Sequence, residues 1–468
     1  MSDHTGPVYQ ARITIYPRSV KGRFRNIKYA ILGVAYGVFF LLPWLRWTRA
    51  TGPDQAVMFD LPERHFYLFD LVVYPQNIFW LAILLVIAAL LLFFVTGVAG
   101  RVWCGYFCFQ TLWTDIYLLI ERLVQGERPA RMRLREHGWT VARVLKLGST
   151  HALWLAMAFW TGLTFTLYWA DAPHLLSAFF EAKAPFAAYV TTFMLTATTY
   201  IFAGIAREQV CTYMCPYARF QSVMFDRDTL IVSYDRHRGE GERGRHKVTR
   251  DLKGQEARQQ AGHGDCIDCG YCVQVCPTGI DIRNGLQVEC IHCALCVDAC
   301  NGIMRNLGWA EGLIRYTSER ALAGGRTRFF KFKTVGYGIA LMAATFLLVS
   351  SVATRAAFDA SVQQTRQPLT VVLSDGRIQN SYAIVVNNTS THRLSLHVGV
   401  RGLNGAHVEV QPSAVMDLLP EASRTVYVKL RYPARANDPK RIPFSFELTP
   451  EGRHAPAPLI LPTQFYTR

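Results

Sequence analysis

The chain has 468 residues, with 50 Lys and Arg against 34 Asp and Glu, which gives a formal net charge of +16. Hydrophobic residues make up 51% of it and charged residues only 18%, too few for an evenly basic, soluble protein that binds nucleic acid. All 12 cysteines lie between Cys104 and Cys300, which is not the distribution of a disulfide-stapled secreted protein. The length predicts two or more domains. The composition predicts apolar membrane-spanning segments with basic flanks, and excludes nucleic acid as the preferred partner.

Five uncharged apolar runs predict membrane-spanning helices. Each reaches the roughly 17–25 residues that cross about 30 Å of hydrocarbon as a helix. The alternative, buried helices in a large soluble core, is disfavoured because the lengths match the thickness of a bilayer so regularly. The runs are Tyr29–Leu45, Ile78–Gly100, Leu147–Ala170, Ala184–Ala206 and Thr334–Thr354.

The distribution of Lys and Arg predicts the orientation of these helices. Basic residues are concentrated in the leader, residues 1–28, and in the loop between the second and third runs, whereas the first and third loops are mainly acidic. The positive-inside rule places the leader in the cytoplasm and, with five spans, the C-terminal part outside. No small-residue cleavage site follows an apolar run of signal-peptide length, so we expect a retained anchor. Every cysteine then lies on the reducing side of the membrane.

Eight of the cysteines form two copies of one pattern. The first reads C-x2-C-x2-C-x3-C-P and ends at Pro277, and the second repeats the spacing and ends at Asn301. This resembles bacterial two-cluster ferredoxins, in which three close thiolates bind one cubane and the fourth binds its neighbour. We predict one 4Fe–4S cluster on Cys266, Cys269, Cys272 and Cys300, and another on Cys290, Cys293, Cys296 and Cys276. Zinc is the weaker interpretation, because two C-x2-C pairs would satisfy it.

The other four cysteines form two C-x3-C pairs, Cys104 with Cys108 after the second run and Cys211 with Cys215 after the fourth. If the chain is helical there, cysteines four apart share one face, and the pairs together present four sulfurs. Soft thiolates suit Cu(I), but they also bind zinc or exchange with disulfides, and small thiols also simply pack. We predict metal or redox use, because the motif recurs at one membrane depth. We call these four the membrane-edge cysteines.

The remaining sequence completes the predicted organisation. A transmembrane region (29–235) is followed by a solvated, charged linker (236–262), a ferredoxin-like domain (263–310), a basic connector (311–333) and the fifth helix (334–354). From 359 to 468, short alternating runs between Asp-Gly, Asn-Asn and Asn-Gly turns predict an immunoglobulin-like antiparallel β-sandwich. The predicted strands are Leu369–Leu373, Tyr382–Val386, Leu394–Val400, Val408–Val410, Thr425–Leu430 and Pro443–Leu448. The fold class is therefore an α-helical membrane protein with two soluble domains.

These motifs together resemble the CcoG (FixG/RdxA) family, accessory proteins for the assembly of cbb-type cytochrome c oxidase. The resemblance is carried by W-C-G-Y-F-C, by R-E-Q-V-C-T-Y-M-C-P, by the ferredoxin motifs and by the C-terminal sandwich; Phe109 departs from the proline expected there. It implies a multi-pass protein of the bacterial inner membrane with a periplasmic C-terminal domain, two 4Fe–4S clusters, and a copper or redox site at the membrane-edge cysteines. It also implies a cupric-reductase-like oxidoreductase that reduces Cu(II) to Cu(I), with oxidase-assembly and copper-delivery proteins as partners.

Two other functions stay open on the sequence. One is a quinol-oxidising electron-transfer subunit that feeds a periplasmic reductase, and the other is a non-enzymatic assembly scaffold with structural or sensory clusters. No P-loop, dinucleotide fingerprint or nucleophile elbow is evident, so electrons must come from another protein or from a membrane quinol.

Overall fold

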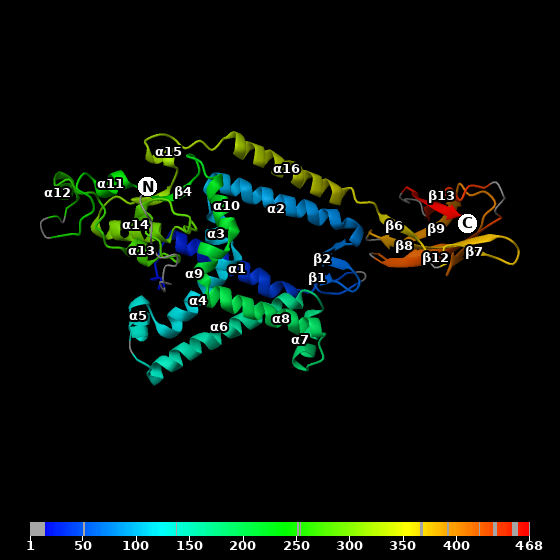
Figure 1. Ribbon diagram of the computed structural model, residues 1–468, viewed down its shortest axis with the longest axis horizontal. Coiled ribbons are helices and arrows are strands. Elements are labelled where there is room, and N and C mark those ends of the chain that lie inside the picture. Colours follow the sequence, from blue (N-terminus) through cyan, green and yellow to red (C-terminus); the bar gives the residue numbers. More distant parts are fainter. Residues whose placement is uncertain are drawn as a thin grey trace, which may run out of the picture. The chain divides into compact units, whose positions relative to one another are not determined.

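The computed structural model describes residues 15–49, 52–136, 138–249, 252, 254–365, 368–390, 393–420, 422–433, 438–451 and 457–467. The chain divides into two compact units (Figure 1). The first unit, Met1–Pro43 with Phe79–Thr345, contains all 12 cysteines. The second, Trp44–Ile78 with Phe346–Arg468, is mostly β-structure. The first 14 residues of the predicted leader lie outside the described residues.

Four helices in the described part of the chain are long and apolar enough to cross a membrane. Their side chains remain largely uncovered by protein: among its described residues α2 buries only Trp80 and Thr96, and α16 only Thr334. Apolar faces of this size call for lipid. The four are α1 (Arg23–Leu41) with η1 (Leu42–Trp44), α2 (Ile78–Ala99), α8 (Phe186–Thr199) with η3 (Tyr200–Ile205), and α16 (Phe332–Ala353).

The predicted third span, Leu147–Ala170, falls largely within α6 (Val141–Leu167), which has 27 residues but is not among those four. Among its polar residues the threonines are buried, and the hydroxyls of Thr161 and Thr166 donate to carbonyls four residues earlier. A Cβ at Gly162 would lie 2.5 Å from a carbonyl oxygen of α8, so the two helices pack backbone to backbone. Small and hydroxyl-bearing residues are typical of contacts between membrane helices.

The first helix begins earlier than predicted, at Arg23 rather than Tyr29. The carboxylate of Asp298, from the ferredoxin-like part, accepts the backbone N–H groups of Phe24 at 3.2 Å and Arg25 at 2.8 Å. These two bonds satisfy donors that a helix start leaves unpaired. The end of the predicted leader is therefore helical. Shorter helices of the same unit are α3 (Val102–Tyr106), α4 (Phe109–Gln125), α5 (Arg128–Glu136), α7 (Ala172–Phe180), α9 (Arg207–Gln209), η4 (Val210–Met214) and α10 (Pro216–Met224).

The ferredoxin-like part extends beyond the predicted 263–310. Strand β4 (Ile231–Tyr234) pairs with β5 (Ile314–Thr317), and Val232 and Ile314 are each 1% exposed in its core. Between these strands lie α13 (Tyr271–Gln274), η5 (Ile282–Asn284) and α14 (Leu295–Leu307), and α15 (Glu319–Leu322) follows. The segments before and after the cysteines thus pair with one another and belong to the same domain.

Many described residues of the predicted linker, 236–262, are exposed, but part of the segment is helical and packed. The segment contains α11 (Arg236–Glu240) and α12 (Gln255–Gln260), and Arg258 is fully buried. The Arg258 guanidinium donates to the carbonyls of Gly264 and Cys266 and lies 5.7 Å from the centre of the Trp309 ring. The segment packs on the ferredoxin-like part because a buried arginine can be satisfied by backbone carbonyls, which a charge pattern does not reveal.

The second unit contains the predicted β-sandwich. One sheet has the order β10-β12-β8-β6, with β7 on β8, and the other has the order β11-β9-β13-β14. Their facing side chains form one core, in which Ile384, Leu396, Val426 and Phe446 have no exposed surface. The strands are β6 (Phe358–Gln364), β7 (Val371–Val372), β8 (Ile378–Asn388), β9 (Leu394–Arg401), β10 (His407–Gln411), β11 (Val415–Leu418), β12 (Ser423–Tyr432), β13 (Arg441–Glu451) and β14 (Leu459–Tyr466).

The sequence patterns missed β6, β11 and β14, and they also missed a small sheet between the first two apolar helices. That sheet is antiparallel and consists of β1 (Val57–Asp60), β2 (His65–Leu68) and β3 (Leu71–Val73). Its strands have only three or four residues, too few for an alternating pattern to stand out.

Candidate functional site

Four of the eight ferredoxin-type cysteines line one pocket, which we call the first pocket: Cys266, Cys269, Cys272 and Cys300. The turn after Cys269 depends on Gly270, whose φ of +65° is left-handed and which caps α13. Cys300 reaches the pocket from α14. Apolar side chains complete the lining, among them Ile267, Ile303 and Leu313. The structure thus brings together the first predicted ligand set.

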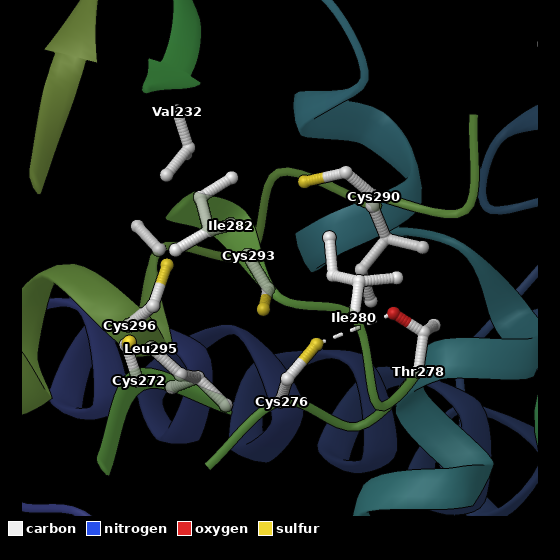
Figure 2. A pocket seen from close by; sticks show the side chains of 12 residues that line it. Val232, Cys272, Cys276, Thr278, Ile280, Ile282, Cys290, Cys293, Leu295 and Cys296 are labelled. Carbon is white, nitrogen blue, oxygen red and sulfur yellow. Dashed lines mark hydrogen bonds between the residues drawn. The ribbon is translucent and has the colours of Figure 1, made fainter. Parts of the chain in front are cut away.

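The second pocket lies beside the first. Its lining includes Cys276, Cys290, Cys293 and Cys296, and Figure 2 shows their sulfur atoms pointing into one space. Cys272 lies at its edge, so it lines both pockets. The hydroxyl of Thr278 lies 3.3 Å from the sulfur of Cys276. The fourth cysteine of each motif therefore faces the other motif's three, as the crossed ligand sets predict.

The chemistry of these cysteines fits iron–sulfur clusters. Burial raises the pKa of Cys272, Cys290 and Cys300 to about 12, and neighbouring thiols add to the shift. Free thiols here would stay protonated at neutral pH, and a bound cation is what makes them thiolates. Among the residues that the structure describes, no three His, Cys, Asp or Glu side chains converge on a single-ion site. Sulfurs spaced around an apolar pocket suit a multi-iron cube better than one zinc ion.

The membrane-edge cysteines differ from the prediction in their local structure. Cys104 lies in α3, but Cys108 is extended (φ −61°, ψ 129°) and is the N-cap of α4. Likewise Cys211 lies in η4, and Cys215 is extended (φ −81°, ψ 107°) and is the N-cap of α10. The prediction that each pair shares one helix face is therefore wrong, because the chain turns at the second cysteine of each pair.

The two membrane-edge motifs are bonded to one another. From α4, Gln110 Nε2 donates to the carbonyls of Phe202 at 2.7 Å and Arg207 at 3.3 Å. From α10, Gln221 Oε1 accepts from the Cys104 sulfur at 3.2 Å and from Arg101 Nε at 3.3 Å. The helix that follows each motif thus forms hydrogen bonds with residues in or next to the other motif.

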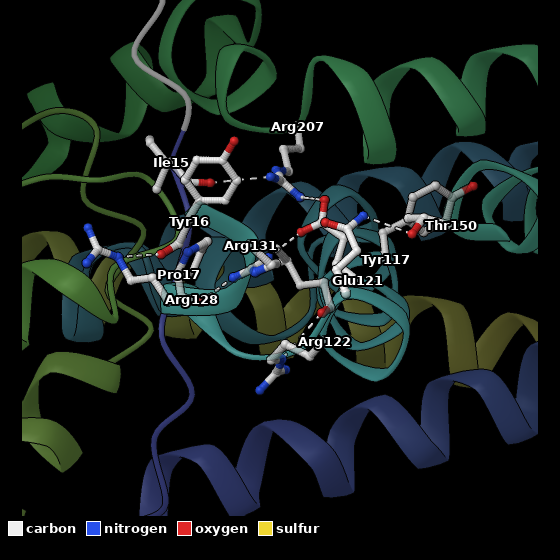
Figure 3. Close-up of polar contacts among 12 residues, drawn as sticks. Ile15, Tyr16, Pro17, Tyr117, Glu121, Arg122, Arg128, Arg131, Thr150 and Arg207 are labelled. Carbon is white, nitrogen blue, oxygen red and sulfur yellow. Dashed lines mark hydrogen bonds and ion pairs between the residues drawn. The ribbon is translucent and has the colours of Figure 1, made fainter. Parts of the chain in front are cut away.

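A buried carboxylate strengthens this connection (Figure 3). Glu121, in α4, lies between the guanidinium groups of Arg131 and Arg207, and its distance to Arg207 is 2.8 Å. The same arginines donate to the leader backbone, Arg131 to the carbonyl of Pro17 at 2.7 Å and Arg207 to that of Ile15 at 3.3 Å. The basic residues near the membrane edge therefore have a structural role besides their value as topology signals.

The first membrane-edge motif also contacts the second pocket directly. The guanidinium of Arg101 donates to the carbonyl of Cys290 at 3.1 Å, and the hydroxyl of Tyr106 donates to that of Cys293 at 3.1 Å. A Cβ at Gly105 would lie 2.7 Å from the carbonyl oxygen of Ile291, so glycine permits this close approach. One short loop thus carries two cysteines of the second pocket and touches the membrane-edge motif.

His292 lies at the centre of this contact. It is fully buried, and its Nδ1 accepts the backbone N–H of Arg101 at 3.0 Å. Burial, aided by Arg101, lowers the pKa of His292 to about 3, so the ring is neutral and can accept this bond. Asp265 and Asp298, which also lie next to or between the cysteines in the sequence, are buried as well. That position beside the cysteines was the only available signal for the three residues.

Burial raises the pKa of Cys104 to about 11 and that of Cys211 to about 12. The other three membrane-edge thiols contribute to the shift at Cys211, so all four lie within electrostatic reach of it. Cys104 and Cys211, one from each pair, also pack in one apolar cluster.

Three family models match the chain. A "4Fe-4S binding domain" matches residues 80–125, and a "4Fe-4S dicluster domain" matches 206–319. The third, described as an "IG-like fold at C-terminal of FixG", matches 348–461 and confirms the predicted class of the sandwich.

Similar proteins are also known over most of the chain. Protein RdxA of Cereibacter sphaeroides is 40% identical over 444 residues, 92% of each chain. Nitrogen fixation protein FixG of Rhizobium meliloti is 39% identical over 445 residues, 88% of this chain and 84% of the relative. A crystal structure of a FixG-related protein from Vibrio parahaemolyticus aligns with 24% of this chain and 95% of its own, at 16% identity and a TM-score of 0.21.

The fold and the cysteine pockets define an iron–sulfur electron-transfer protein with membrane-spanning helices. Within that class, the chain belongs to the FixG/RdxA family.

Proposed function

We propose that this protein passes single electrons from its ferredoxin-like part to the membrane-edge cysteines and there reduces Cu(II) to Cu(I) for the assembly of a cbb-type cytochrome c oxidase. The observation that carries the proposal is the direct bonding between the loop of the second pocket and the first membrane-edge motif. Tyr106 and Arg101 each donate to the backbone of a second-pocket cysteine. An electron leaving that pocket has a short, bonded path to Cys104.

The eight ferredoxin-type cysteines hold two 4Fe–4S clusters in this proposal. When bound, these clusters supply centres that accept and release one electron each. The chain supplies the rest: apolar side chains line both pockets and exclude water, Cys272 faces both pockets, and Gly105 allows the close approach to the membrane edge. Each Cu(II) takes one electron, which a protein donor or a membrane quinol must replace.

The same proposal assigns five spans, with α6 as the third. The stretch from Leu147 to Leu167 has no Asp, Glu, Lys or Arg, and its threonines are buried. Five spans place the cysteines in the cytoplasm and the β-sandwich in the periplasm of a bacterial inner membrane. Oxidase-assembly and copper-delivery proteins are then the partners, besides membrane lipid.

The test is Cu(II) reduction by anaerobically purified protein. Protein reduced with dithionite and freed of excess reductant is mixed with Cu(II) and a Cu(I)-specific chelator. We expect wild-type protein to form Cu(I) in proportion to its reduced clusters, and the double variant Cys104→Ser/Cys211→Ser to form it at least tenfold more slowly. An equal rate in the variant would refute the role of these cysteines. Cluster oxidation that depends on quinone and ignores copper would favour the quinol-linked function instead.

A further inference from the structure

A further pocket lies beside the second ferredoxin-type pocket, and we call it the arginine pocket. Its lining comes from four parts of the first unit: the leader before α1, the first turn of α1, the helix α4 and the ferredoxin-like part. Leu295, at the start of α14, lines both this pocket and the second pocket. No cysteine lines it, so the proposed electron path does not use it.

Basic side chains dominate the arginine pocket. Three arginines line it: Arg18, Arg25 and Arg122. One carboxylate, Asp115, lines it as well, but that group is already paired, with Arg25 at 3.3 Å and with Lys28 at 2.9 Å. Within the described ranges, neither Arg18 nor Arg122 forms an ion pair with a carboxylate. The pocket therefore has an excess of positive charge, which an anion would balance.

One guanidinium nitrogen of this pocket has no hydrogen-bond partner. The side chain of Arg25 is 6% exposed, and its Nη1 donates to Asp115. Its Nη2 is buried and donates to no acceptor in the part of the chain that the structure describes. The ring of Tyr29, whose centre lies 4.0 Å from the guanidinium, offers a π face but no oxygen. Because a buried charged donor without an acceptor is costly, this atom points to a ligand that supplies one.

The residue types favour a phosphate group as that ligand. The planar fork of arginine matches the oxygens of a phosphate, and three arginines here can share one group. Arg18 is exposed, Arg122 is half-buried and Arg25 is buried, so the arginines range from the surface to the interior. Ser19 adds a hydroxyl to the lining.

The surroundings of the pocket point to a lipid as the source of the phosphate. α1 is one of the four helices that are apolar enough to cross a membrane, and Arg25 lies in its first turn. Close to the arginines in the sequence, Ile27 and Tyr29 are 38% and 39% exposed, and Leu123 is 76% exposed. Basic pockets beside apolar surface at the end of a membrane helix are typical sites for anionic lipid headgroups.

We propose that the arginine pocket binds the phosphate group of an anionic membrane lipid. The headgroup bridges the leader, α1 and α4 through Arg18, Arg25 and Arg122. Val275 and Leu295 of the ferredoxin-like part line the same pocket, so the bound lipid also holds that part against the membrane helices. This binding does not depend on the reduction of copper.

The test counts lipid molecules on full-length protein that has been freed of lipid in a nonionic detergent. Phosphatidylglycerol, phosphatidylcholine or inorganic phosphate is added, and native mass spectrometry gives the number bound per chain. We expect about one phosphatidylglycerol to bind, and to bind about tenfold more weakly to Arg18→Gln/Arg122→Gln. Phosphatidylcholine should bind more weakly to wild-type protein, because its headgroup has no net charge. Arg25 is left unchanged because of its buried ion pair with Asp115.

The matched control removes the same charge elsewhere. Arg133→Gln/Arg219→Gln replaces two exposed arginines of α5 and α10 that do not line the pocket, and it should bind phosphatidylglycerol as the wild type does. Iron content and the electron paramagnetic resonance signals of the ferredoxin-type clusters show whether each variant is folded. If the first double variant does not accumulate, the single variant Arg18→Gln, at an exposed side chain, takes its place.

Equal binding of phosphatidylglycerol by the wild type and Arg18→Gln/Arg122→Gln would overturn the site. An equal loss in the control variant would also overturn it, because the attraction would then be a general effect of charge. Inorganic phosphate that binds in preference to phosphatidylglycerol, and that needs the same two arginines, would overturn the lipid as the ligand.

Discussion

At the residue scale, the contact between the second pocket and the membrane edge depends on a few side chains with little freedom. Gly105 has no room for a Cβ beside Ile291, and His292 accepts from the backbone of Arg101 with both residues almost fully buried. None of these residues would bind iron. In the proposed function they set the distance that an electron crosses from the ferredoxin-like part to the membrane-edge cysteines, so we regard them as positioning residues.

A valine at position 105 tests this. Gly105→Val would push the Ile291 loop away from α3, because a Cβ at position 105 would already lie 2.7 Å from the carbonyl oxygen of Ile291, and it would disrupt the contacts on which the proposed path depends. We expect Cu(I) formation to fall at least tenfold while the iron content stays at the wild-type value.

The control for that substitution is Gly302→Ala in α14, where a Cβ meets no atom within 4 Å. It should leave both Cu(I) formation and iron content unchanged. Unchanged Cu(I) formation in Gly105→Val would show that the contact does not carry the electron.

At the scale of elements, the ferredoxin-like part and the first helix support one another. Asp298 lies in α14, between two cluster cysteines, and caps the start of α1 with two backbone hydrogen bonds. Behind that start, Arg25 and Lys28 form buried ion pairs with Asp115 of α4, at 3.3 and 2.9 Å. The start of α1 is therefore packed against the ferredoxin-like part.

Removal of this cap has a defined expectation. Asp298→Ala should cost about 1 kcal/mol, the usual value of an N-cap, concentrated in the first turn of α1. Hydrogen exchange should show faster exchange at Phe24 and Arg25, with no change in the β-sandwich. The matched control is Asp268→Ala, an acidic residue of the same domain that pairs at the surface with Arg283. Equal exchange rates at Phe24 and Arg25 in both variants would contradict the capping role of Asp298.

Removal of iron has a second expectation at this scale. Seven of the eight ferredoxin-type cysteines are at least partly buried. Burial raises the pKa of five of them, which leaves neutral thiols once the metal is gone. Metal-coupled folding is the rule for small metal domains. Anaerobic chelation of iron should therefore lower the unfolding temperature of the ferredoxin-like part and leave that of the sandwich unchanged. An equal fall in the unfolding temperatures of the ferredoxin-like part and the sandwich would contradict the expectation that iron stabilises only the first.

Much of this arrangement was predictable, and the missed polar contacts share one physical cause. Apolar length located α1, α2, α8 and α16, and cysteine spacing located the two pockets, because each signal lies within a short stretch of sequence. The buried role of Arg258, the packing of 236–262 and the crossed bonds of Gln110 and Gln221 depend on partners far along the chain. Charge and glycine content predict whether a segment is solvated, but they do not predict which backbone carbonyls will accept hydrogen bonds from a guanidinium.

At the scale of the whole molecule, the number of spans decides on which side of the membrane the β-sandwich lies. α6 has 27 residues, and its threonines are buried, so they would not be exposed to lipid. With α6 counted, the two ends of the chain lie on opposite sides; without it, they lie on the same side.

Fusions at the C-terminus distinguish these cases. We expect alkaline phosphatase joined after the β-sandwich to be active in cells, and green fluorescent protein at the same place to be dark, because only the first matures in the periplasm. Fusions before α1 should give the opposite result. A bright fluorescent protein at the C-terminus would contradict the count of five spans. It would also contradict the prediction that the cysteines and the sandwich lie on opposite sides of the membrane.

The central claim is that electrons leave the ferredoxin-like part through the membrane-edge cysteines to Cu(II). The most direct measurement is rapid mixing of dithionite-reduced full-length protein with Cu(II), following reoxidation of the ferredoxin-type clusters in wild-type protein and in Cys104→Ser/Cys211→Ser. We predict fast reoxidation with one Cu(I) formed per electron in the wild type, and reoxidation at least tenfold slower in the variant with its ferredoxin-type clusters intact. Equal rates in the two proteins would contradict the account.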